Sequence, residues 1–213
     1  MASILNPQDP YPNAYRSIIG HFVPSAVMGA LSRAAPNRVL AEGAGPTWSI
    51  TANGERRPGQ RFGTHIILGC GQGASAMRDG MDAVTYPGNP ANTPIEVLER
   101  DTGFRFETKA LRRDSGGIGQ HRGGWGQKIA LRVVSSSPLT IGVHAARTAI
   151  SAEGLGGGGP GTIGSVSVNG APANIQQQFS VNPGDLLVLE TPGGGGWGQA
   201  RDEGHATDPV HVA

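Results

Sequence analysis

The chain has 213 residues, of which 37% are hydrophobic, so it can bury one substantial core or two small ones. Its 17 basic and 16 acidic side chains nearly cancel, which excludes the strong field that would draw the chain to nucleic acid or to an anionic membrane. Cys70 is the only cysteine, so the chain cannot form an internal disulfide. No secretory signal opens the sequence, and no apolar run approaches the roughly 20 residues of a membrane span. We therefore expect a cytoplasmic protein.

Residues 1–36 predict an extended lead-in followed by a helical segment. The first twelve residues are rich in proline, and Asn13 can cap a short helix that reaches Phe22. Pro24 fits the first turn of a second helix, which Pro36 ends. Apolar residues recur in this second helix at the spacing of one helical face: Val27, Ala30, Leu31 and Ala34.

Residues 37–198 predict a glycine-rich β body. Glycine accounts for 35 residues of the chain, well above the usual share of roughly 7%, and the glycines cluster between apolar runs, which favours tight turns over disorder. The dipeptides Asn53-Gly54 and Asn169-Gly170 and the tripeptide Pro183-Gly184-Asp185 are typical of turns. The predicted strands are 47–51, 62–68, 104–111, 128–134, 139–144, 163–168 and 186–190.

This pattern of short strands and frequent turns indicates a β-sandwich or a barrel. The expected fold is therefore mainly β with a short helical N-terminal segment. Residues 199–213 are polar, and we expect them to form a tail that is frayed or docked on a partner.

The stretch from Asp114 to Gly126 is the most unusual part of the sequence, with six glycines in thirteen positions. It brings together a carboxylate, a titratable ring and a fixed cation on one predicted loop: Asp114, His121 and Arg122. One interpretation is a site loop that holds an anion or a carbonyl through backbone N–H groups and Arg122. The alternative is a glycine-packed connector that an Asp114–Arg122 pair merely staples, and the residues alone leave both open.

Before this loop, Pro94 can start a short helix with Thr93 or Asn92 as its cap and Glu96 in its first turn. This local chemistry explains the residues structurally, and a catalytic Glu96 is the alternative. Cys70 reads as a small buried residue in a tight turn rather than a nucleophile.

The sequence lacks the usual signatures of a nucleotide site and of a metal site. The glycines around residue 70 do not have the spacing of a dinucleotide fingerprint, and neither lysine follows a glycine as in a P-loop. No two histidines have the spacing of metal ligands, so we expect no metal site made wholly within this chain. Nearly all basic side chains are arginine, which favours fixed ion pairs.

Three motifs, in this order, resemble the hydantoinase B/oxoprolinase family: residues 92–99 (NTPIEVLE), 111–126 (LRRDSGGIGQHRGGWG) and 191–198 (TPGGGGWG). Residues 29–36 also fit, so the resemblance covers nearly the whole chain. It implies pairing with a hydantoinase A-like subunit that binds ATP and phosphorylates the substrate. Such enzymes open cyclic amides such as hydantoins and 5-oxoproline, and relatives carboxylate ketones such as acetone and acetophenone.

The resemblance also implies a division of labour, because family subunits are longer and carry their metal ligands in an amino-terminal part. We therefore expect ATP and a divalent metal in partner chains, namely the hydantoinase A-like subunit and an amino-terminal hydantoinase B-like chain, and no cofactor bound by this chain alone. The expected function is a non-autonomous subunit of an ATP-dependent hydantoinase, 5-oxoprolinase or lactamase. The alternatives are a subunit of a ketone carboxylase and a non-catalytic structural module.

On this interpretation the candidate catalytic residues are Asp114, His121 and Arg122. The candidate residues for binding a small-molecule substrate are Ser115, Asn92 and Glu96. If the chain is part of a larger fold, an apolar patch should mark the missing contact. The helix that bears Val27 and Leu31 is the expected place.

Overall fold

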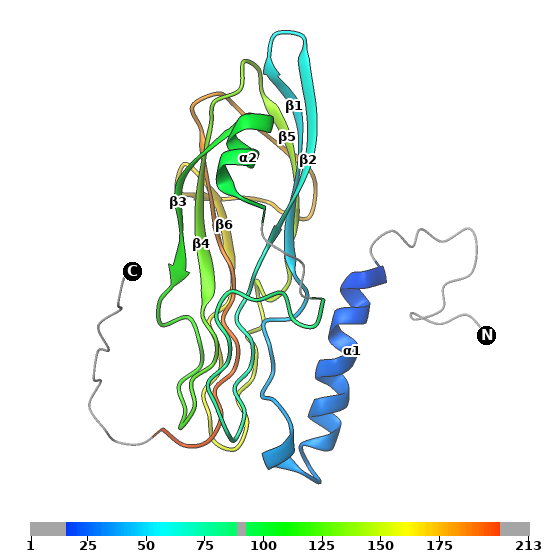
Figure 1. Ribbon diagram of the computed structural model, residues 1–213, viewed down its shortest axis with the longest axis vertical. Coiled ribbons are helices and arrows are strands. Elements are labelled where there is room, and N and C mark those ends of the chain that lie inside the picture. Colours follow the sequence, from blue (N-terminus) through cyan, green and yellow to red (C-terminus); the bar gives the residue numbers. More distant parts are fainter. Residues whose placement is uncertain (1–15, 89–92, 201–213) are drawn as a thin grey trace, which may run out of the picture.

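The computed structural model describes residues 16–88 and 93–200, and its body consists of two antiparallel sheets packed face to face (Figure 1). The four-stranded sheet has the order β2-β1-β5-β8 and the five-stranded sheet the order β3-β4-β9-β6-β7. This arrangement confirms the mainly β class and is the sandwich of the two predicted alternatives. The strands are β1 (Trp48–Arg57), β2 (Gln60–Leu68), β3 (Phe104–Arg112), β4 (Gly126–Val133), β5 (Leu139–His144), β6 (Ser165–Val168), β7 (Ala171–Pro172), β8 (Phe179–Val181) and β9 (Leu186–Glu190).

The hydrophobic core lies between the two sheets. Trp48, Ile50 and Ala52 alternate along β1 and are fully buried, because every second residue of a strand faces the same side. They share this core with the inward residues of the opposite sheet, among them Ile129, Leu131, Leu187 and Leu189. Burying each large apolar side chain contributes about 1.5–3 kcal/mol, so this layer is the main source of stability for the body.

The strands at 139–144 and 186–190 were predicted with the bounds they have, but the turn predicted at Asn53-Gly54 is wrong. Both residues lie inside β1, and the chain turns instead at Pro58-Gly59, where Gly59 has a φ of 75°. A Cβ at position 54 would lie 2.4 Å from Cδ2 of the buried Leu139. Gly54 is therefore there to make room for a core side chain and not to supply a turn conformation.

The other two predicted turns are confirmed. Asn169 and Gly170 have φ values of 51° and 83° and join β6 to β7 as a tight hairpin. Gly184, with a φ of 91°, leads into β9. Asp185 stabilises this second turn, because its carboxylate accepts hydrogen bonds from the Asn182 N–H at 2.7 Å and the Asn169 amide at 2.8 Å.

The N-terminal segment forms one helix, α1 (Arg16–Leu31), and not the two that were expected. Pro24 lies inside it, since a proline removes one backbone donor but does not have to end a helix. The expected cap Asn13 lies outside the described residues. A short 3-10 turn, η1 (Pro36–Arg38), follows.

The short helix expected after Pro94 is present as α2 (Ile95–Asp101), with Glu96 in its first turn. Its N-cap is Pro94, and no side chain caps it, so the expected cap by Thr93 is wrong. The alternative cap Asn92 lies outside the described residues. No helix among residues 16–88 and 93–200 is long and apolar enough to cross a membrane.

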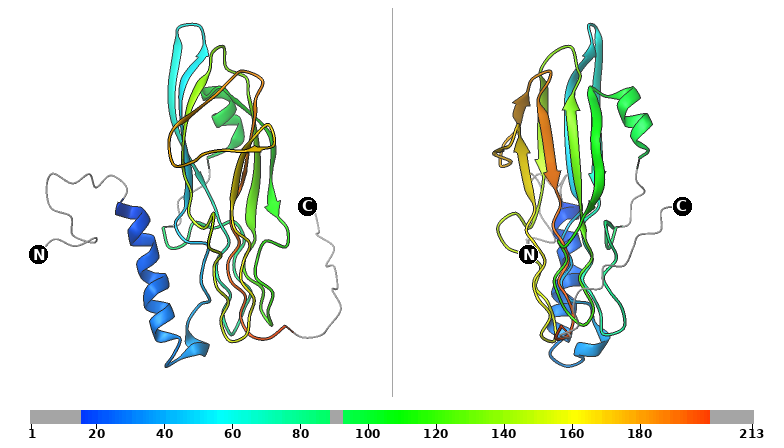
Figure 2. Two further views of the ribbon diagram at one scale, coloured as in Figure 1. Left: turned by 180° about the vertical axis from the view of Figure 1, so that it is seen from behind. Right: turned by 90° about the vertical axis from the view of Figure 1, so that its left-hand side faces the viewer.

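Below the sandwich, extended segments run side by side in what we call the glycine bundle, defined as residues 40–45, 69–84, 115–126, 151–162 and 191–198 (Figures 1 and 2). From Gly193 to Trp197, consecutive residues donate their N–H groups to different neighbouring segments, and residues three apart donate to the same segment. Gly198 departs from this pattern, because it donates to Leu155. This repeat of three is that of a polyproline II-type helix, whereas a β-strand repeats every two residues. The bonds run from Gly193 to Thr162, Gly194 to Gly124, Gly195 to Glu42, Gly196 to Gly159 and Trp197 to His121.

Such packing explains the glycine content of the chain. Neighbouring segments approach on every side, so most side chains would meet another backbone. A Cβ at Gly194 would lie 2.1 Å from the Gln72 carbonyl oxygen, and one at Gly117 would lie 2.1 Å from that of Gly159. The glycines thus serve close packing of backbones, as at the crowded axis of collagen, more than turns.

Candidate functional site

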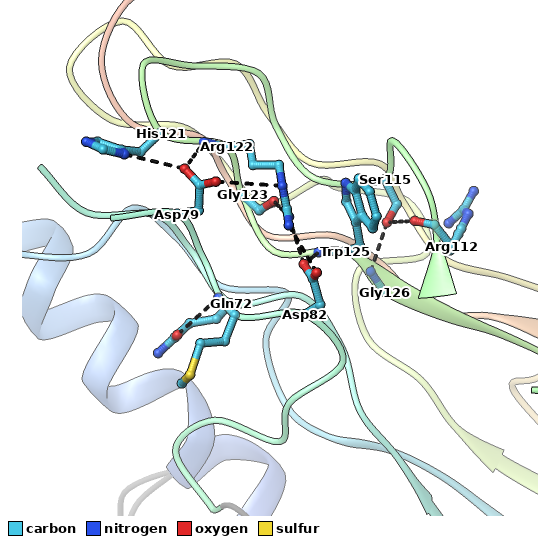
Figure 3. A network of polar contacts seen from close by, with 11 residues as sticks. Gln72, Asp79, Asp82, Arg112, Ser115, His121, Arg122, Gly123, Trp125 and Gly126 are labelled. Carbon is cyan, nitrogen blue, oxygen red and sulfur yellow. Dashed lines mark hydrogen bonds and ion pairs between the residues drawn. The ribbon is translucent and has the colours of Figure 1, made fainter. Parts of the chain in front are cut away.

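Arg122 lies at the centre of a polar network that joins two segments of the glycine bundle (Figure 3). Its guanidinium donates to both oxygens of Asp82, at 2.7 and 3.0 Å, and stacks on the ring of Trp125 with 4.3 Å to the ring centroid. The Trp125 N–H donates to the same carboxylate at 2.7 Å. The hydrogen bond to Asp82 raises the pKa of Arg122, so this cation is fixed in charge and position.

Asp79 extends the network to His121. One oxygen of this carboxylate accepts the Arg122 backbone N–H at 3.0 Å and lies 3.4 Å from Nδ1 of His121. The backbone of His121 exchanges two hydrogen bonds with Trp197, of 3.0 and 2.8 Å. The side chains of His121 and Asp79 remain partly exposed, so this corner of the bundle can be reached from solvent.

The structure changes the role expected for Asp114. Asp114 is exposed and has a φ of 58°, in the connection between β3 and β4. The loop is stapled by the bidentate pair of Arg122 with Asp82, 40 residues away, and not by the expected pair of Arg122 with Asp114. Sequence reasoning missed Asp79 and Asp82 as partners because only the bundle brings these segments together.

Ser115 is buried, and its hydroxyl group is used within the chain. Its Oγ donates to the Arg112 carbonyl at 2.6 Å and accepts the Gly126 N–H at 2.8 Å. These bonds close the loop between β3 and β4. Glu96 is exposed on α2, at the opposite end of the sheets from the glycine bundle (Figure 1), so the structure does not bring it together with His121 and Arg122. Asn92 lies outside the described residues.

A cleft of about 540 Å³ separates α1 from the glycine bundle, and no pattern in the sequence predicted it. Its size is that of a small-molecule site. One wall is α1, and the other is built from three bundle segments and the residues after β5. The residues that line it are Phe22, Ser25, Ala26, Met28, Gly29, Ser32, Leu40, Ala41, Glu42, Gly43, Gln72, Gly73, Tyr86, Arg147, Ile150, Glu153, Gly154 and Leu155.

Three charged side chains line this cleft. Two of them, Arg147 and Glu42, form an ion pair between residues 105 positions apart, and the third is the exposed Glu153. The Arg147 side chain is only 11% exposed, its backbone has a φ of 61°, and it also donates to the Ser151 carbonyl at 3.0 Å. The other oxygen of Glu42 accepts the Glu153 N–H at 2.9 Å. Both groups are therefore held in place before any ligand arrives.

Arg147 has more N–H groups than these bonds use. One of them, Nε, is buried and has no hydrogen-bond partner among the residues that the structure describes. Its Cζ lies 5.7 Å from the ring centroid of Phe22 on α1, so the guanidinium contacts both walls of the cleft. Gln72 is a further polar group at the cleft, and its amide oxygen accepts a long bond of 3.5 Å from the Met81 N–H. The cleft thus combines apolar walls with a few fixed polar groups, which is typical of ligand sites.

The thiol of Cys70 is buried and is not expected to act as a nucleophile. Burial raises the pKa of the Cys70 thiol from 9.0 to about 12, which keeps it protonated at neutral pH. The structure therefore agrees with the interpretation as a small buried residue. Among residues 16–88 and 93–200, no three histidine, cysteine, aspartate or glutamate side chains form a group that could hold a metal ion.

Comparison with known proteins adds evidence of descent. The profile of the family described as hydantoinase B/oxoprolinase matches residues 1–200. The chain is 29% identical to the 5-oxoprolinase PfmaA of Pestalotiopsis fici over 98% of its own length and 18% of that protein. It is 26% identical to the caprolactamase subunit beta of Pseudomonas jessenii, over 92% of this chain and 36% of that subunit. The chain thus spans little more than a third, or less, of these relatives.

Solved structures share the fold. A chain of the crystal structure of ATP-dependent caprolactamase from Pseudomonas jessenii superimposes with a TM-score of 0.70 and 25% identity, covering 91% of this chain and 36% of that one. A nucleotide-free structure of acetone carboxylase gives a TM-score of 0.63 with 19% identity, covering 84% of this chain and 30% of that one. The second likeness concerns the fold alone.

Proposed function

We propose, from the premise that this chain belongs to the hydantoinase B/oxoprolinase family, that it is a non-autonomous subunit of an ATP-dependent enzyme that opens cyclic amides. Its relatives are named as a 5-oxoprolinase and a caprolactamase subunit, which supports a cyclic amide as the substrate class. We further propose that a hydantoinase A-like chain supplies the ATP site, and that the rest of a hydantoinase B-type subunit supplies the divalent metal.

The observation that carries the proposal is the ion pair of Arg147 and Glu42 at the cleft. A guanidinium only donates hydrogen bonds, and an ionised carboxylate only accepts them. The amide of a small ring is held cis, so its C=O and N–H point to the same side. A cyclic amide can therefore place its oxygen against Arg147 and its N–H against Glu42, in a single approach along one edge.

The role of this chain is then to hold and orient the ring. Fixing a substrate against a reactive partner removes much of the entropic part of a barrier, provided the groups are preorganised. Arg147 and Glu42 meet this condition, because Ser151 and Glu153 hold them by backbone hydrogen bonds. ATP-dependent phosphorylation of the amide oxygen, carried out by the partner chain, would activate the ring carbon toward water. Expulsion of the ring nitrogen from the adduct would then break the C–N bond and leave an acyl phosphate, which water would hydrolyse to a carboxylate and phosphate.

The alternative of a ketone carboxylase has a different requirement at the same cleft. A ketone has an oxygen that can accept from Arg147, but it has no N–H to donate to Glu42. The acceptor would then have no role in substrate binding. Loss of the Glu42 carboxylate should therefore impair the opening of a cyclic amide but not the carboxylation of a ketone, and this difference distinguishes the two functions.

The test is a reconstituted complex of this chain with its hydantoinase A-like and hydantoinase B-like partners. Ring opening of hydantoin, 5-oxoproline or caprolactam is measured with and without ATP, and acetone with bicarbonate is tested in parallel. We expect ring opening that requires both ATP and this chain. Ring opening by this chain alone without ATP, or turnover only with the ketone and bicarbonate, would contradict the proposal.

The same complex distinguishes the proposed function from the alternative of a non-catalytic structural module. If the chain only supported assembly, substitutions of Arg122 would reduce complex formation and activity in parallel, and substitutions of Glu42 would leave both unchanged. Loss of activity in a complex that assembles normally would exclude a purely structural role.

A further inference from the structure

Helix α1 has two opposite faces with different surroundings. Phe22, Ser25 and Gly29 face the cleft. Val23, Val27 and Leu31 follow one another at intervals of four residues, so they share one face, and a helix of 3.6 residues per turn places that face away from the cleft. These three side chains are 39%, 51% and 51% exposed.

The helix is weakly held by the rest of the described chain. No residue between Gly20 and Leu31 is buried, and a Cβ added at Gly20 or at Gly29 would meet nothing within 4 Å. The sequence of α1 also contains Pro24 and two glycines, which are poor helix formers. Since an isolated helix of this length is marginal in water even with good formers, α1 needs further packing to be stable.

The chemistry of the helix restricts what can cover it. No charged residue occurs between Arg16 and Arg33, so the matching surface must be apolar rather than acidic or basic. An exposed apolar stripe on a helix face is typical of a contact with another part of a protein. Figure 2 shows that α1 stands beside the body, with no other labelled helix or strand of the described chain on its outer side.

The comparisons indicate which part of a protein covers this face of α1. This chain matches 36% of the caprolactamase subunit beta, so more than half of that subunit lies outside the matched part and must be accommodated around it. We propose that the outer face of α1, defined by Val23, Val27 and Leu31, packs against this remaining part of a hydantoinase B-type subunit. The inference rests on the proposed function, which supplies that partner.

Docking at this face would have a consequence for the cleft. The inner face of α1 forms one wall, and Phe22 contacts the Arg147 guanidinium across it. A partner that packs on the outer face therefore fixes α1 in position and with it the wall opposite Glu42 and Arg147. Assembly and the substrate cleft are coupled through a single helix.

Photocrosslinking in the assembled complex tests the contact. p-Benzoylphenylalanine replaces Val27 in one preparation and Val134 in the other, because Val134 is also a valine and is 48% exposed. After irradiation, mass spectrometry identifies the crosslinked peptides. We expect position 27 to crosslink to peptides of a hydantoinase B-type sequence and position 134 not to do so. Crosslinks from position 27 to a hydantoinase A-like chain or to a second copy of this chain, equal crosslinking at both positions, or no crosslink at position 27 would overturn the inference.

A second measurement uses charge. Val27→Asp combined with Leu31→Asp places two carboxylates on the stripe, and we expect the dissociation constant of the complex to rise about tenfold or more. Val134→Asp is the control, and circular dichroism of each variant verifies the β body. An unchanged dissociation constant for the double variant would contradict the contact. Both readouts report assembly alone, so a complex that crosslinks as expected but opens no cyclic amide would contradict only the proposed function.

Discussion

The guanidinium of Arg122 and the carboxylate of Asp82 form two parallel hydrogen bonds, of 2.7 and 3.0 Å, across 40 residues of sequence. The same carboxylate accepts the Trp125 N–H. Asp82 therefore ties one segment of the glycine bundle to the next by three bonds. Its removal would leave the half-buried cation with only the longer ion pair to Asp79, at 3.8 Å.

Asp82→Asn is expected to lower the free energy of unfolding by about 1–2 kcal/mol, since Arg122 is partly exposed and solvent screens part of the loss. Urea unfolding at neutral pH measures this change. Asp101→Asn breaks the exposed pair of Asp101 with Arg100 and serves as the control, with little expected change because solvent screens this pair. Equal effects of the two substitutions would show that the bundle does not depend on Asp82.

A single methyl group should disrupt the glycine bundle. In Gly194→Ala the added Cβ would lie 2.1 Å from the Gln72 carbonyl oxygen, and backbone atoms on that side cannot move away as a side chain could. We expect a loss of about 3 kcal/mol or more in the free energy of unfolding, or no soluble protein.

Gly20→Ala provides the matched control for that prediction. A Cβ at position 20 meets nothing within 4 Å, and alanine is the better helix former by about 0.8–1 kcal/mol. This substitution should leave stability unchanged or raise it slightly. If both alanines behaved alike, the close packing of the bundle would not be the reason for its glycines.

The burial of the Cys70 thiol predicts that the free energy of unfolding depends on pH. Its pKa is raised from 9.0 to about 12 in the folded protein by burial. Between these two pH values the unfolded chain releases the proton and the folded chain keeps it, so the free energy of unfolding falls as pH rises, by at most about 1.4 kcal/mol per pH unit from this group. At lower pH both states hold the proton, and the thiol contributes no slope.

Urea unfolding at pH 8, 9 and 10 measures this slope in the natural sequence and in Cys70→Ala. Other groups that titrate in this range act equally in both proteins, so the difference in slope belongs to the thiol. We also expect the native thiol to resist modification by a disulfide reagent until the chain is unfolded. Rapid modification of the folded protein at pH 8 would contradict its burial.

The cleft is tested by two substitutions. Arg147→Lys keeps the charge but loses the planar fork, and Glu42→Gln keeps the shape but loses the charge of the acceptor. In the assembled complex we expect each to lower kcat/KM for a cyclic amide about tenfold to a hundredfold, mainly through a higher KM. Complex formation should be unchanged.

Glu107→Gln is the control for these variants, because it weakens another Arg–Glu ion pair, that of Arg132 with Glu107 on the outer face of the sandwich. It should leave kcat/KM unchanged. Retention of full kcat/KM in both cleft variants would rule out substrate binding by Arg147 and Glu42.

Much of the sandwich could be predicted from the sequence. The segments 139–144 and 186–190 are short apolar runs bounded by turn residues, and in both cases the strand has the predicted bounds. Such runs carry their own local signal. The turn predicted at Asn53-Gly54 is wrong because glycine is used both in turns and where two segments approach closely. Only the position of Leu139 on the neighbouring strand distinguishes the two uses.

The candidate sites were harder to predict, because their pairs are distant in sequence. Asp82 reaches Arg122 across 40 residues, and Glu42 reaches Arg147 across 105. The abundance of arginine predicted fixed ion pairs but not their partners. The partners follow from the order in which glycine segments stack, and this order depends on hydrogen bonds whose three-residue repeat leaves no hydrophobic pattern in the sequence.

The glycine bundle also has a consequence for the order of folding. Glycine loses more backbone freedom on folding than any other residue. The apolar side chains that the bundle buries are small and offset little of that loss locally: Ala41, Ala44, Cys70, Ala74 and Ala152. Its hydrogen bonds join segments as far apart as residues 42 and 195, so each requires a large loop to close first. We therefore expect the sandwich to form early and to bring the segments together, so that the bundle, and with it the wall of the cleft that carries Glu42, becomes ordered last.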